Sequence, residues 1–599
     1  MPYYRQDPQR QVVVNANWTK GAHNARFGTE IYRQGLNHTQ AEFLSAVFGA
    51  QGGFNFGRGV TSRCEVANPD GTCVTVSDDS RYNSFASLVL GLPVQRGRTL
   101  QVPDVYHVHA WVYSAYARDR WNISPKLTLD YGVRWEYFPV PTRPDRGIER
   151  FDLNTGKVLV CGLGSVPKDC GIEISKKRFA PRLGLAYRPT NTFVIRAGYG
   201  MTNDPYEAME PLRANYPVLL SLNQTNVKGS LFPVGTLAEG IPIITPPDAT
   251  SGVVDIPPDF GFIGLPKKFD RGYVQSWNFT IQKELKYGFT AQAGYVATRQ
   301  TRELAFLDIN AGQVIGAGDQ GRTLFQRLGR VAETTEIRPI GTGHYDSLQA
   351  SLQRRFTQGL EMSVNYTWGK AVSLVCNSDN HPGGDNCNGG GEVQALRYFN
   401  LNRSVPGFDR RHNLEITTVW QLPFGRGMRW LGNGGAASAI AGGWQINTLM
   451  SFISGPPFTA YADSTSLNLP GSTQQADQIK PHIKKLGGIG TGDPFYDPTA
   501  FADISDARFG TSGFNILRGP GIVNLDFGLF RQFSISERWK LQFRAEAFNF
   551  TNTPHFNTPE DGYTCVCDGE DFMTITTTTN LAREGIDERQ FRFGLRLSF

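Results

Sequence analysis

The sequence predicts an all-β protein, a transmembrane antiparallel β-barrel of about 15 strands, and three observations lead to this prediction. Of the 599 residues, 12% are aromatic and 66 are glycine, a composition that favours strands and turns over helices. Apolar and polar residues alternate with a period of two in many segments. Short turns and long polar stretches alternate between these segments, as they do in barrels that span a membrane.

Composition argues against two other classes of protein. Charged residues make up 19%, the mean hydropathy is -0.33, and no segment approaches the roughly 18 uninterrupted apolar residues of a membrane-spanning helix. A barrel can have such an average because it shows lipid only every second residue. The net charge of +6 is small for this length and the Lys and Arg residues are scattered, so we expect no nucleic-acid partner.

The alternation is clearest in the segment KLTLDYGVRWEYF at 126–138. One face carries Leu127, Leu129, Tyr131, Val133, Trp135 and Tyr137, and the other carries Thr128, Asp130, Arg134 and Glu136. Residues 360–368 and 541–547 follow the same rule. We expect the apolar face to meet lipid. Charges of the other face, such as Arg134, Glu136, Arg544 and Glu546, are expected to pair with one another across strands or with a plug.

Aromatic residues gather near the expected strand ends. They include Trp111, Tyr113, Trp121, Trp135, Tyr137, Trp277, Trp368 and Trp420. This placement is typical of the aromatic girdles that mark the two membrane–water interfaces of a barrel. Some of these rings could instead stack on sugars or peptides at the mouth of the barrel.

The connections set the direction of each strand. The expected strands are roughly 10–21, 23–34, 105–122, 126–138, 179–190, 192–204, 273–285, 288–299, 344–356, 360–371, 410–422, 444–458, 522–533, 539–552 and 590–599. Short turns join them in pairs, and long polar loops separate the pairs. If the long loops are extracellular, all eight cysteines lie outside and the C-terminus is periplasmic. Only the Gly-rich connection 423–443 is too long for the short-turn side.

The eight cysteines lie in four local groups. Cys64 and Cys73, Cys161 and Cys170, and Cys376 and Cys387 flank polar segments, and Cys565 and Cys567 form the sequence CVC. We expect these residues to form disulfides in an oxidising compartment. Closing about ten residues contributes about 2.7 kcal/mol, enough to order a loop rather than to hold the fold. Zinc is the alternative, but no paired CxxC spacing supports it, and we expect no metal or cofactor.

The strand count predicts that the sequence holds only part of a barrel. With the long loops outside, the first strand runs inward, and about 15 is an odd count, whereas single-chain bacterial barrels have even counts. We therefore expect residues 1–599 to be one barrel domain that lacks its opening strands. The N-terminal segment MPYYRQDPQR also shows no signal-peptide pattern.

Six segments then appear in a recognisable order. They are FAPRLGLAYRPTNTFVIRAGYG, YVQSWNFTIQKEL, HYDSLQASLQRRF, FDRRHNLEITTVWQLPFG, GGWQINTLMSFISGPPFT and RGPGIVNLDFGLFRQFSISERWKLQFRAEAFNFTNTPHFNTP. Together they resemble the barrel of TonB-dependent outer-membrane receptors of the Oar-like group, from about residue 10 to 599. The resemblance implies a barrel of about 22 strands, an N-terminal plug and a TonB-contacting segment ahead of it. The sequence shows neither plug nor segment, so the TonB system is expected to act through a plug outside this chain.

The last strand carries a further expectation. In RQFRFGLRLSF, one face holds Phe591, Phe593, Leu595, Leu597 and Phe599. A terminal run this apolar needs lipid to cover it, and its backbone needs the first strand of a barrel to close the edge. The resemblance implies that the barrel-assembly machinery reads this pattern during insertion.

These observations predict a bacterial outer-membrane protein that is not an enzyme, since HExxH, GxSxG and P-loop motifs are all missing. The resemblance implies a receptor barrel that moves a bulky, unidentified solute. The alternative is a surface structural or adhesive barrel whose disulfide-linked loops meet partners while nothing crosses. Acidic segments at 377–386 and 559–571 could hold calcium, but their spacing matches no EF-hand and solvated loops explain them.

The cysteine spacing yields a direct test. Peptide mapping of the non-reduced protein is expected to link Cys64 to Cys73, Cys161 to Cys170, and Cys376 to Cys387, because each pair flanks a short loop. The reduced digest serves as the control. Free thiols at these positions would contradict the extracellular placement of the long loops.

Overall fold

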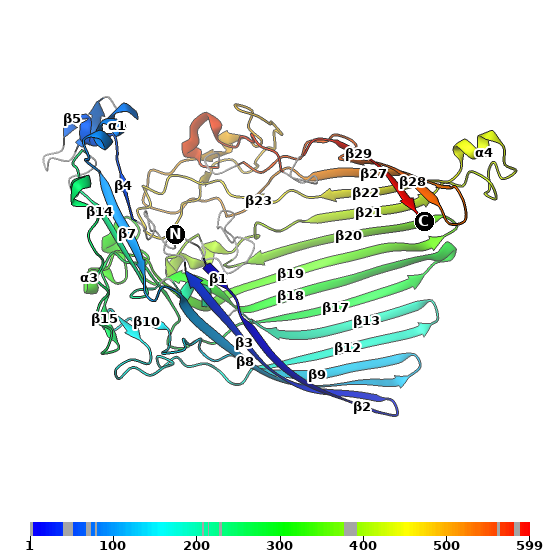
Figure 1. Ribbon diagram of the computed structural model, residues 1–599, viewed down its shortest axis with the longest axis horizontal. Helices are drawn as coiled ribbons and strands as arrows, with labels where there is room; N and C mark the ends of the chain where they lie inside the picture. Colours follow the sequence, from blue (N-terminus) through cyan, green and yellow to red (C-terminus); the bar gives the residue numbers. More distant parts are fainter. Residues whose placement is uncertain are drawn as a thin grey trace.

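The protein is a curved wall of antiparallel strands with its long loops gathered at one end (Figure 1). The computed structural model describes residues 4–39, 52–67, 73–77, 81–205, 209–213, 215–226, 231–375, 392–559, 564–579 and 587–599. Its main sheet has 17 strands, of which β1 (Tyr4–Gln6) and β16 (Phe262–Gly264) are short additions at the loop end. The other strands follow one another in chain order, as a meander of fifteen.

The strands of the meander have the following bounds. They are β2 (Gln9–Lys20), β3 (His23–Thr39), β8 (Tyr106–Ser124), β9 (Leu127–Tyr137), β12 (Phe179–Thr190), β13 (Phe193–Asn203), β17 (Tyr273–Glu284), β18 (Phe289–Asp308), β19 (Thr334–Thr357), β20 (Leu360–Ser373), β21 (His412–Gln421), β22 (Trp444–Ile453), β27 (Ile522–Ser534), β28 (Lys540–Phe548) and β29 (Gln590–Ser598). Each of the expected strands is present, so the all-β antiparallel prediction is confirmed. Among the described residues, β2 pairs only with β3 and β29 only with β28, so the expected pairing of the last strand with a first strand is not seen.

Two strands are much longer than the sequence predicts. β18 and β19 have 20 and 24 residues, and their ladder continues to the pair Asp308 and Thr335, well inside the predicted loop 300–343. The register shifts near Glu303, where the regular alternation breaks. Beyond this point Leu304, Leu307 and Ile337 are fully buried against the loops. The extension is therefore stabilised by loop packing rather than by lipid, which explains why period-two patterning did not reveal it.

One face of the wall, here called the apolar face, is lined by exposed hydrophobic side chains. Its members include Val12, Val14, Phe27, Ile31, Tyr131, Val133, Leu183, Leu185, Phe279, Ile281, Tyr295, Leu348, Phe593 and Leu595. Phe279 and Leu183 are each 52% exposed, and an array of this size on a water-facing surface would be unfavourable. From Leu127 to Tyr137 the face extends about 33 Å along the strand, or about 25 Å in height at a tilt of about 40°. This height matches the hydrocarbon layer of a membrane.

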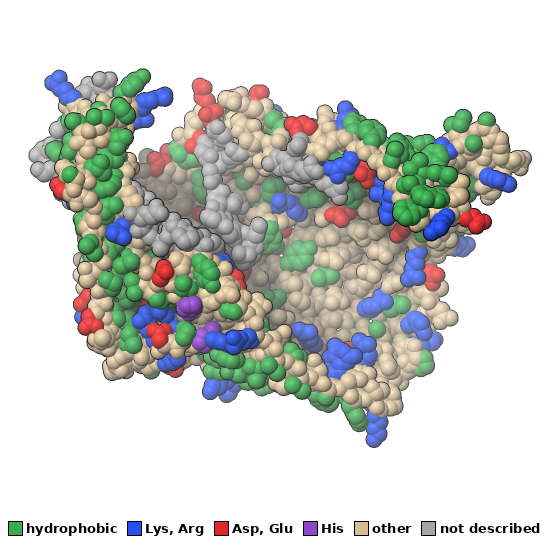
Figure 2. Space-filling model, in the orientation of Figure 1, with side chains coloured by type: hydrophobic (Ala, Val, Ile, Leu, Met, Phe, Trp, Pro, Cys, Tyr) green, Lys and Arg blue, Asp and Glu red, His purple; other side chains and the backbone are tan. Residues whose placement is uncertain are grey.

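The opposite face, here called the polar face, lines the hollow of the wall. Figure 2 looks into this hollow, where polar side chains and backbone with scattered charges dominate. The alternation in each strand produces both faces at once, because successive side chains point to opposite sides of the sheet. Among the described residues, no helix is both long and apolar enough to cross a bilayer.

The loop end contains small sheets and helices of its own. Its strands are β4 (Gly53–Asn55), β5 (Arg63–Ala67), β6 (Cys73–Ser77), β7 (Gln95–Gln101), β10 (Glu149–Asp152), β11 (Lys157–Val160), β14 (Leu219–Thr225), β15 (Val253–Asp255), β23 (Pro457–Phe458), β24 (Asp477–Gln478), β25 (Phe501–Ala502) and β26 (Leu517–Arg518). Its helices are α1 (Arg81–Val89), α2 (Met209–Leu212) and α3 (Phe325–Leu328). The described parts of the long loops thus form small folded units.

The compact hydrophobic cores of the described residues lie at this loop end. One cluster joins Leu36, Tyr106, Val108 and Ala110 of β3 and β8 to loop residues that include Ile148, Leu212 and Leu265. A second cluster joins the loop between β22 and β27 to the loop between β28 and β29, through residues that include Phe458, Phe501, Leu517, Met573 and Ile575. The loops therefore pack on one another and on the strand ends, as the domains of a soluble protein do.

The other end of the wall has short turns. Gln358 and Gly359 join β19 to β20 with positive φ values of 51° and 78°, the conformation that tight turns need. The exception is the predicted long connection 423–443, which contains α4 (Ala436–Ala441) and projects from the turn end in Figure 1. The connection 423–443, which the sequence shows to be too long for a short turn, is thus an insertion at the turn end.

The two faces can be tested with one pair of substitutions in β17. Phe279→Arg places a charge on the apolar face, and Asn278→Arg places the same charge on the polar face one residue away. Near mid-membrane the first change should lower the free energy of unfolding by about 2–4 kcal/mol, while the second should have little effect. Urea unfolding in lipid vesicles measures both, and equal losses would contradict the assignment of the faces.

Candidate functional site on the polar face and the loop end

A network of charged and polar side chains from four strands extends over the polar face between β3 and β13. Arg134 of β9 lies 2.8 Å from Glu30 Oε2 of β3 and 2.9 Å from Glu136 Oε1, and it donates to Ser114 Oγ of β8 at 2.7 Å. Asn203 of β13 donates to the second oxygen of Glu136 at 3.0 Å. Arg134 thus reaches across β8 to Glu30, and Glu136 is paired both with Arg134 of its own strand and with Asn203 beyond β12. Arg134 and Glu136 therefore pair with each other as expected, but within β9, and the partner across strands is Glu30.

The other predicted pair is not formed. Arg544 of β28 donates from Nε to Gln542 Oε1 at 2.9 Å, and its guanidinium lies 5.1 Å from the centre of the Phe530 ring. Within the described residues it makes no ion pair with Glu546, so for these two charges only the other expectation, pairing with a plug, stays a prediction. Stacking on the aromatic ring of the adjacent strand offers the guanidinium a partner that sequence spacing did not suggest.

Buried ion pairs brace the loops at the mouth of the hollow. Glu149, which is fully buried, lies 3.2 Å from Arg143 Nη1 and 3.3 Å from Arg146 Nη2. Burial raises the pKa of the Glu149 carboxyl, although the two guanidinium groups oppose the shift. Arg518 lies 2.6 Å from Asp409, whose other oxygen accepts from the backbone of Ala371 in β20. The loops are therefore tied to the strand ends at fixed positions.

The structure forms the Cys161–Cys170 disulfide inside the first loop cluster. The two Cα atoms are 5.1 Å apart, and both side chains are buried beside Ile148 and Ile172. Cys64 is also disulfide-bonded. The side chain of its expected partner Cys73, and both Cys376 and Cys387, lie outside the described residues, so those pairings stay predictions. The cysteines whose bonding is described are oxidised, as the spacing predicts.

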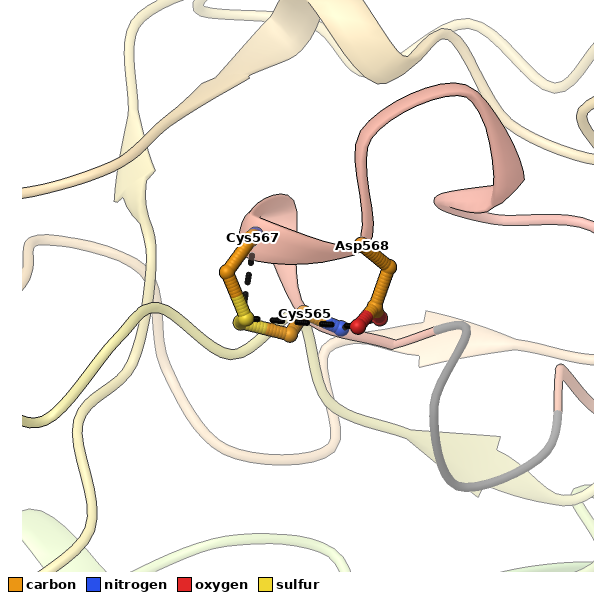
Figure 3. Close-up of side chains that lie close together, drawn as sticks. All are labelled: Cys565, Cys567 and Asp568. Atoms are coloured by element: carbon orange, nitrogen blue, oxygen red, sulfur yellow. Dashed lines mark hydrogen bonds between the residues drawn. A yellow bond between two sulfur atoms is a disulfide. The ribbon is translucent and has the colours of Figure 1, made fainter. Parts of the chain in front are cut away.

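Cys565 and Cys567 form a second bonded pair beside Asp568 (Figure 3). The backbone N–H of Cys565 donates to Asp568 Oδ2 at 2.8 Å, and partial burial raises the pKa of this carboxyl. The ligand-type atoms of the three residues lie within 4.8 Å of one another, a spacing that would suit a metal ion. The bond between the sulfurs, however, uses both thiolates that such a site would need. Cys565 and Cys567 therefore cross-link this loop and do not offer metal ligands.

The last strand completes the apolar face. Phe591, Phe593, Leu595 and Leu597 of β29 pair in register with Ala547, Ala545, Phe543 and Leu541 of β28. Phe599 is 81% exposed, and its ring lies 5.1 Å from that of Trp539 in the adjacent turn. The terminal run thus continues the lipid-facing surface of its neighbours. Its role as an assembly signal stays a prediction.

Aromatic rings mark the loop-end border of the apolar face. Trp111, Tyr113 and Tyr137 form a stacked row with centroids 6.1 and 6.3 Å apart. Further along the wall, the Arg299 guanidinium lies 5.1 Å from the Trp277 ring and 2.9 Å from Asp346. Rings and charges of this kind are typical of a membrane–water interface, and their role as a girdle stays a prediction.

Comparison with known proteins agrees with this geometry. Residues 1–592 match the family model described as an outer membrane beta barrel domain. No curated protein matches the chain. Solved structures that resemble it include the siderophore receptor PiuA from Acinetobacter baumannii, with 12% identity, a TM-score of 0.40 and coverage of 99% of this chain and 56% of that one.

Two further structures are similar to the same extent. The outer membrane transporter YddB from Escherichia coli has 9% identity and a TM-score of 0.46, over 99% of this chain and 54% of that chain. The FrpB iron transporter from Neisseria meningitidis has 10% identity and a TM-score of 0.43, over 100% and 57%. The chain thus spans a little over half the length of these structures.

The terminal aromatic residue gives a test of assembly. Deleting Phe599 should lower the amount of folded protein in the membrane, because the deletion removes the end of the apolar strand and its ring contact with Trp539. Ser598→Ala, on the other face of β29, is the matched control. Membrane fractionation followed by gel mobility without boiling measures the folded amount. Normal abundance after the deletion would contradict a role of this residue in assembly.

Proposed function

The chain belongs to the outer membrane β-barrel family, and from this premise we propose that it forms the wall of a TonB-dependent receptor that moves a bulky solute across the outer membrane. The observation that carries the proposal is the polar hollow, whose charges, such as Arg134, Glu30 and Glu136, are paired rather than aimed at lipid. A barrel with such a lining offers a path for water and polar solutes. The six segments that resemble the Oar-like receptors support the choice of class.

In this proposal the loop end faces outward and binds the solute. Its hydrophobic clusters and its ion pairs, such as Arg518 with Asp409, would hold a rigid binding surface. A plug, which the resemblance implies, would rearrange when TonB pulls on it and open the path. The C-terminus would then be periplasmic, and the barrel-assembly machinery would insert the wall through its last strand.

A surface structural or adhesive protein is the second candidate. The same packing favours it, because loops with buried cores and disulfides such as Cys161–Cys170 could present a durable surface to partners. Under that reading nothing would cross the hollow. The two candidates differ in whether TonB changes the hollow, since only a transporter needs the path to open.

Cysteine labelling in living cells tests the proposal. Asn278→Cys places a thiol on the polar face, and Phe279→Cys places one on the apolar face as the control. In the full natural protein, an added membrane-impermeant maleimide should label Asn278→Cys several-fold faster with an active TonB system than without one, because the plug moves. Phe279→Cys should stay unlabelled in lipid. Labelling of Asn278→Cys that is independent of TonB would contradict the transporter and favour the structural protein.

A further inference from the structure

A pocket of about 380 Å³ opens on the apolar-face side of the wall, just beyond its hydrophobic belt. Arg10 of β2 and Arg33 of β3 line it together with His107 and His109 of β8. The register pairs Arg10 with Arg33, and Arg33 with Trp111. Arg10, Arg33 and Trp111 therefore lie side by side on adjacent strands, and His109 and His107 follow toward the loop end of β8.

The level of the two arginines is that of lipid headgroups. The next same-face position toward the turns on each strand is occupied by Val12, Ile31 and Tyr113, which are about 7 Å away along the strands and belong to the apolar face. Trp111 begins the row of aromatic rings that borders the belt. A ligand in the pocket would thus have its polar part beside the arginines and its apolar part on Val12 and Ile31.

The pocket carries uncompensated positive charge. No Asp or Glu lines it, and among the described residues neither Arg10 nor Arg33 makes an ion pair. The Arg33 guanidinium lies 5.7 Å from the centre of the Trp111 ring, and its Nε is buried without a hydrogen-bond partner. Lys168, held in the loop closed by the Cys161–Cys170 disulfide, lies within electrostatic reach of His109. An anion would supply the missing acceptor.

The rim of the pocket is already ordered. His107 Nδ1 lies 2.8 Å from Asn37 Oδ1, and Asn37 donates to Gln6 Oε1 at 3.0 Å. His109 Nε2 lies 3.3 Å from Thr142 Oγ1. These contacts leave the two arginines as the groups with unused donors, since each guanidinium has five.

Another arginine at the loop-end border of the belt provides the contrast. Arg299 of β18 also stacks on a tryptophan, Trp277, but it is neutralised by Asp346 at 2.9 Å. An arginine at this border of the belt is therefore not unpaired simply because it lies at the membrane interface. The missing carboxylate beside Arg10 and Arg33 points to a partner from outside the chain.

We propose that this pocket binds the phosphate-bearing headgroup of an anionic lipid of the surrounding bilayer. Arg10 and Arg33 donate to the phosphate oxygens, a pairing that suits the planar guanidinium fork. The acyl chains lie on the adjacent apolar face, and the bilayer supplies the headgroup at the level of the pocket. Free phosphate has the same chemistry as the headgroup, but it has no acyl chains that would pack on Val12 and Ile31. The site is independent of solute transport.

Native mass spectrometry of the full natural protein, released from lipid nanodiscs, tests the site. Protein from nanodiscs with phosphatidylglycerol should retain one more bound lipid than protein from phosphatidylcholine nanodiscs. The double variant Arg10→Gln, Arg33→Gln should lose this lipid, whereas Arg299→Gln should keep it. Gel mobility without boiling confirms that each variant is folded. Added inorganic phosphate at the same concentration should not displace the lipid.

Three results would overturn the proposal. Equal retention of the two lipids would show that the anionic headgroup is not recognised. Retention of the lipid by the folded double variant would show that Arg10 and Arg33 do not bind it. Displacement by inorganic phosphate would identify a free anion as the occupant. Loss of TonB-dependent labelling elsewhere in the protein would affect none of these outcomes, so the site and the transport function can fail separately.

Discussion

The structure depends on one constraint: each strand has to satisfy its backbone hydrogen bonds with its neighbours while its two faces meet different surroundings. In a membrane no water is available to replace a missing backbone partner, so strands span it only when paired. The unbroken ladder from β2 to β29 meets this demand for every strand between these two, whereas among the described residues β2 pairs only with β3 and β29 only with β28. Phe279 points to the apolar face, and the preceding residue, Asn278, points to the polar face.

The same constraint determines where charge and core can lie. On the polar face, Arg134 lies 2.8 Å from Glu30 and 2.9 Å from Glu136. On the apolar face, the carboxylate of Asp119 accepts a hydrogen bond from the Tyr131 hydroxyl at 3.0 Å and lies 2.6 Å from His23 Nδ1. At the loop-end border of the belt charges also lie on the apolar face, as at Arg299 and Arg33, each stacked on a tryptophan. A membrane wall one sheet thick encloses no interior of its own. The buried hydrophobic residues therefore gather in the loops, where water drives them together.

The loops and the wall consequently have different physical origins. The wall is stabilised by hydrogen-bonded ladders and by lipid, while the loop end is stabilised as a soluble domain is, through packed clusters, buried ion pairs and disulfides. Cys161–Cys170 belongs to such a cluster, where it joins packing that is already present. This division leaves the loops free to vary for binding while the wall keeps its pattern.

Much of the wall could be predicted from the sequence, because period two is a local signal that each strand carries by itself. The ranges of β12 and β17 were expected almost to the residue. The outer parts of β18 and β19 were missed, since their pattern breaks at Glu303 and their partners are distant loops. Arg544 was expected to pair with another charge across strands or with a plug, whereas its guanidinium lies over Phe530 of the adjacent strand. Residue spacing within one strand could not reveal it.

The pocket formed by Arg10, Arg33, His107 and His109 was missed for the same reason. Its four residues come from three strands, and only the register between those strands brings them together. The loop clusters are also non-local, because Phe458 and Met573 meet across more than a hundred residues of chain. Sequence alternation predicts which way a side chain points, but it does not predict which distant side chain it meets.

The measurement that tests the central claim most directly is the accessibility of spin labels along β17, from 276 to 283, in lipid bilayers. If one face of the wall meets hydrocarbon, collisions with dissolved oxygen should peak at positions 277, 279 and 281, and collisions with a water-soluble nickel complex should peak at the positions between them. A flat profile, or both collision rates peaking together, would show that no lipid boundary runs along this strand, and the membrane wall would be refuted.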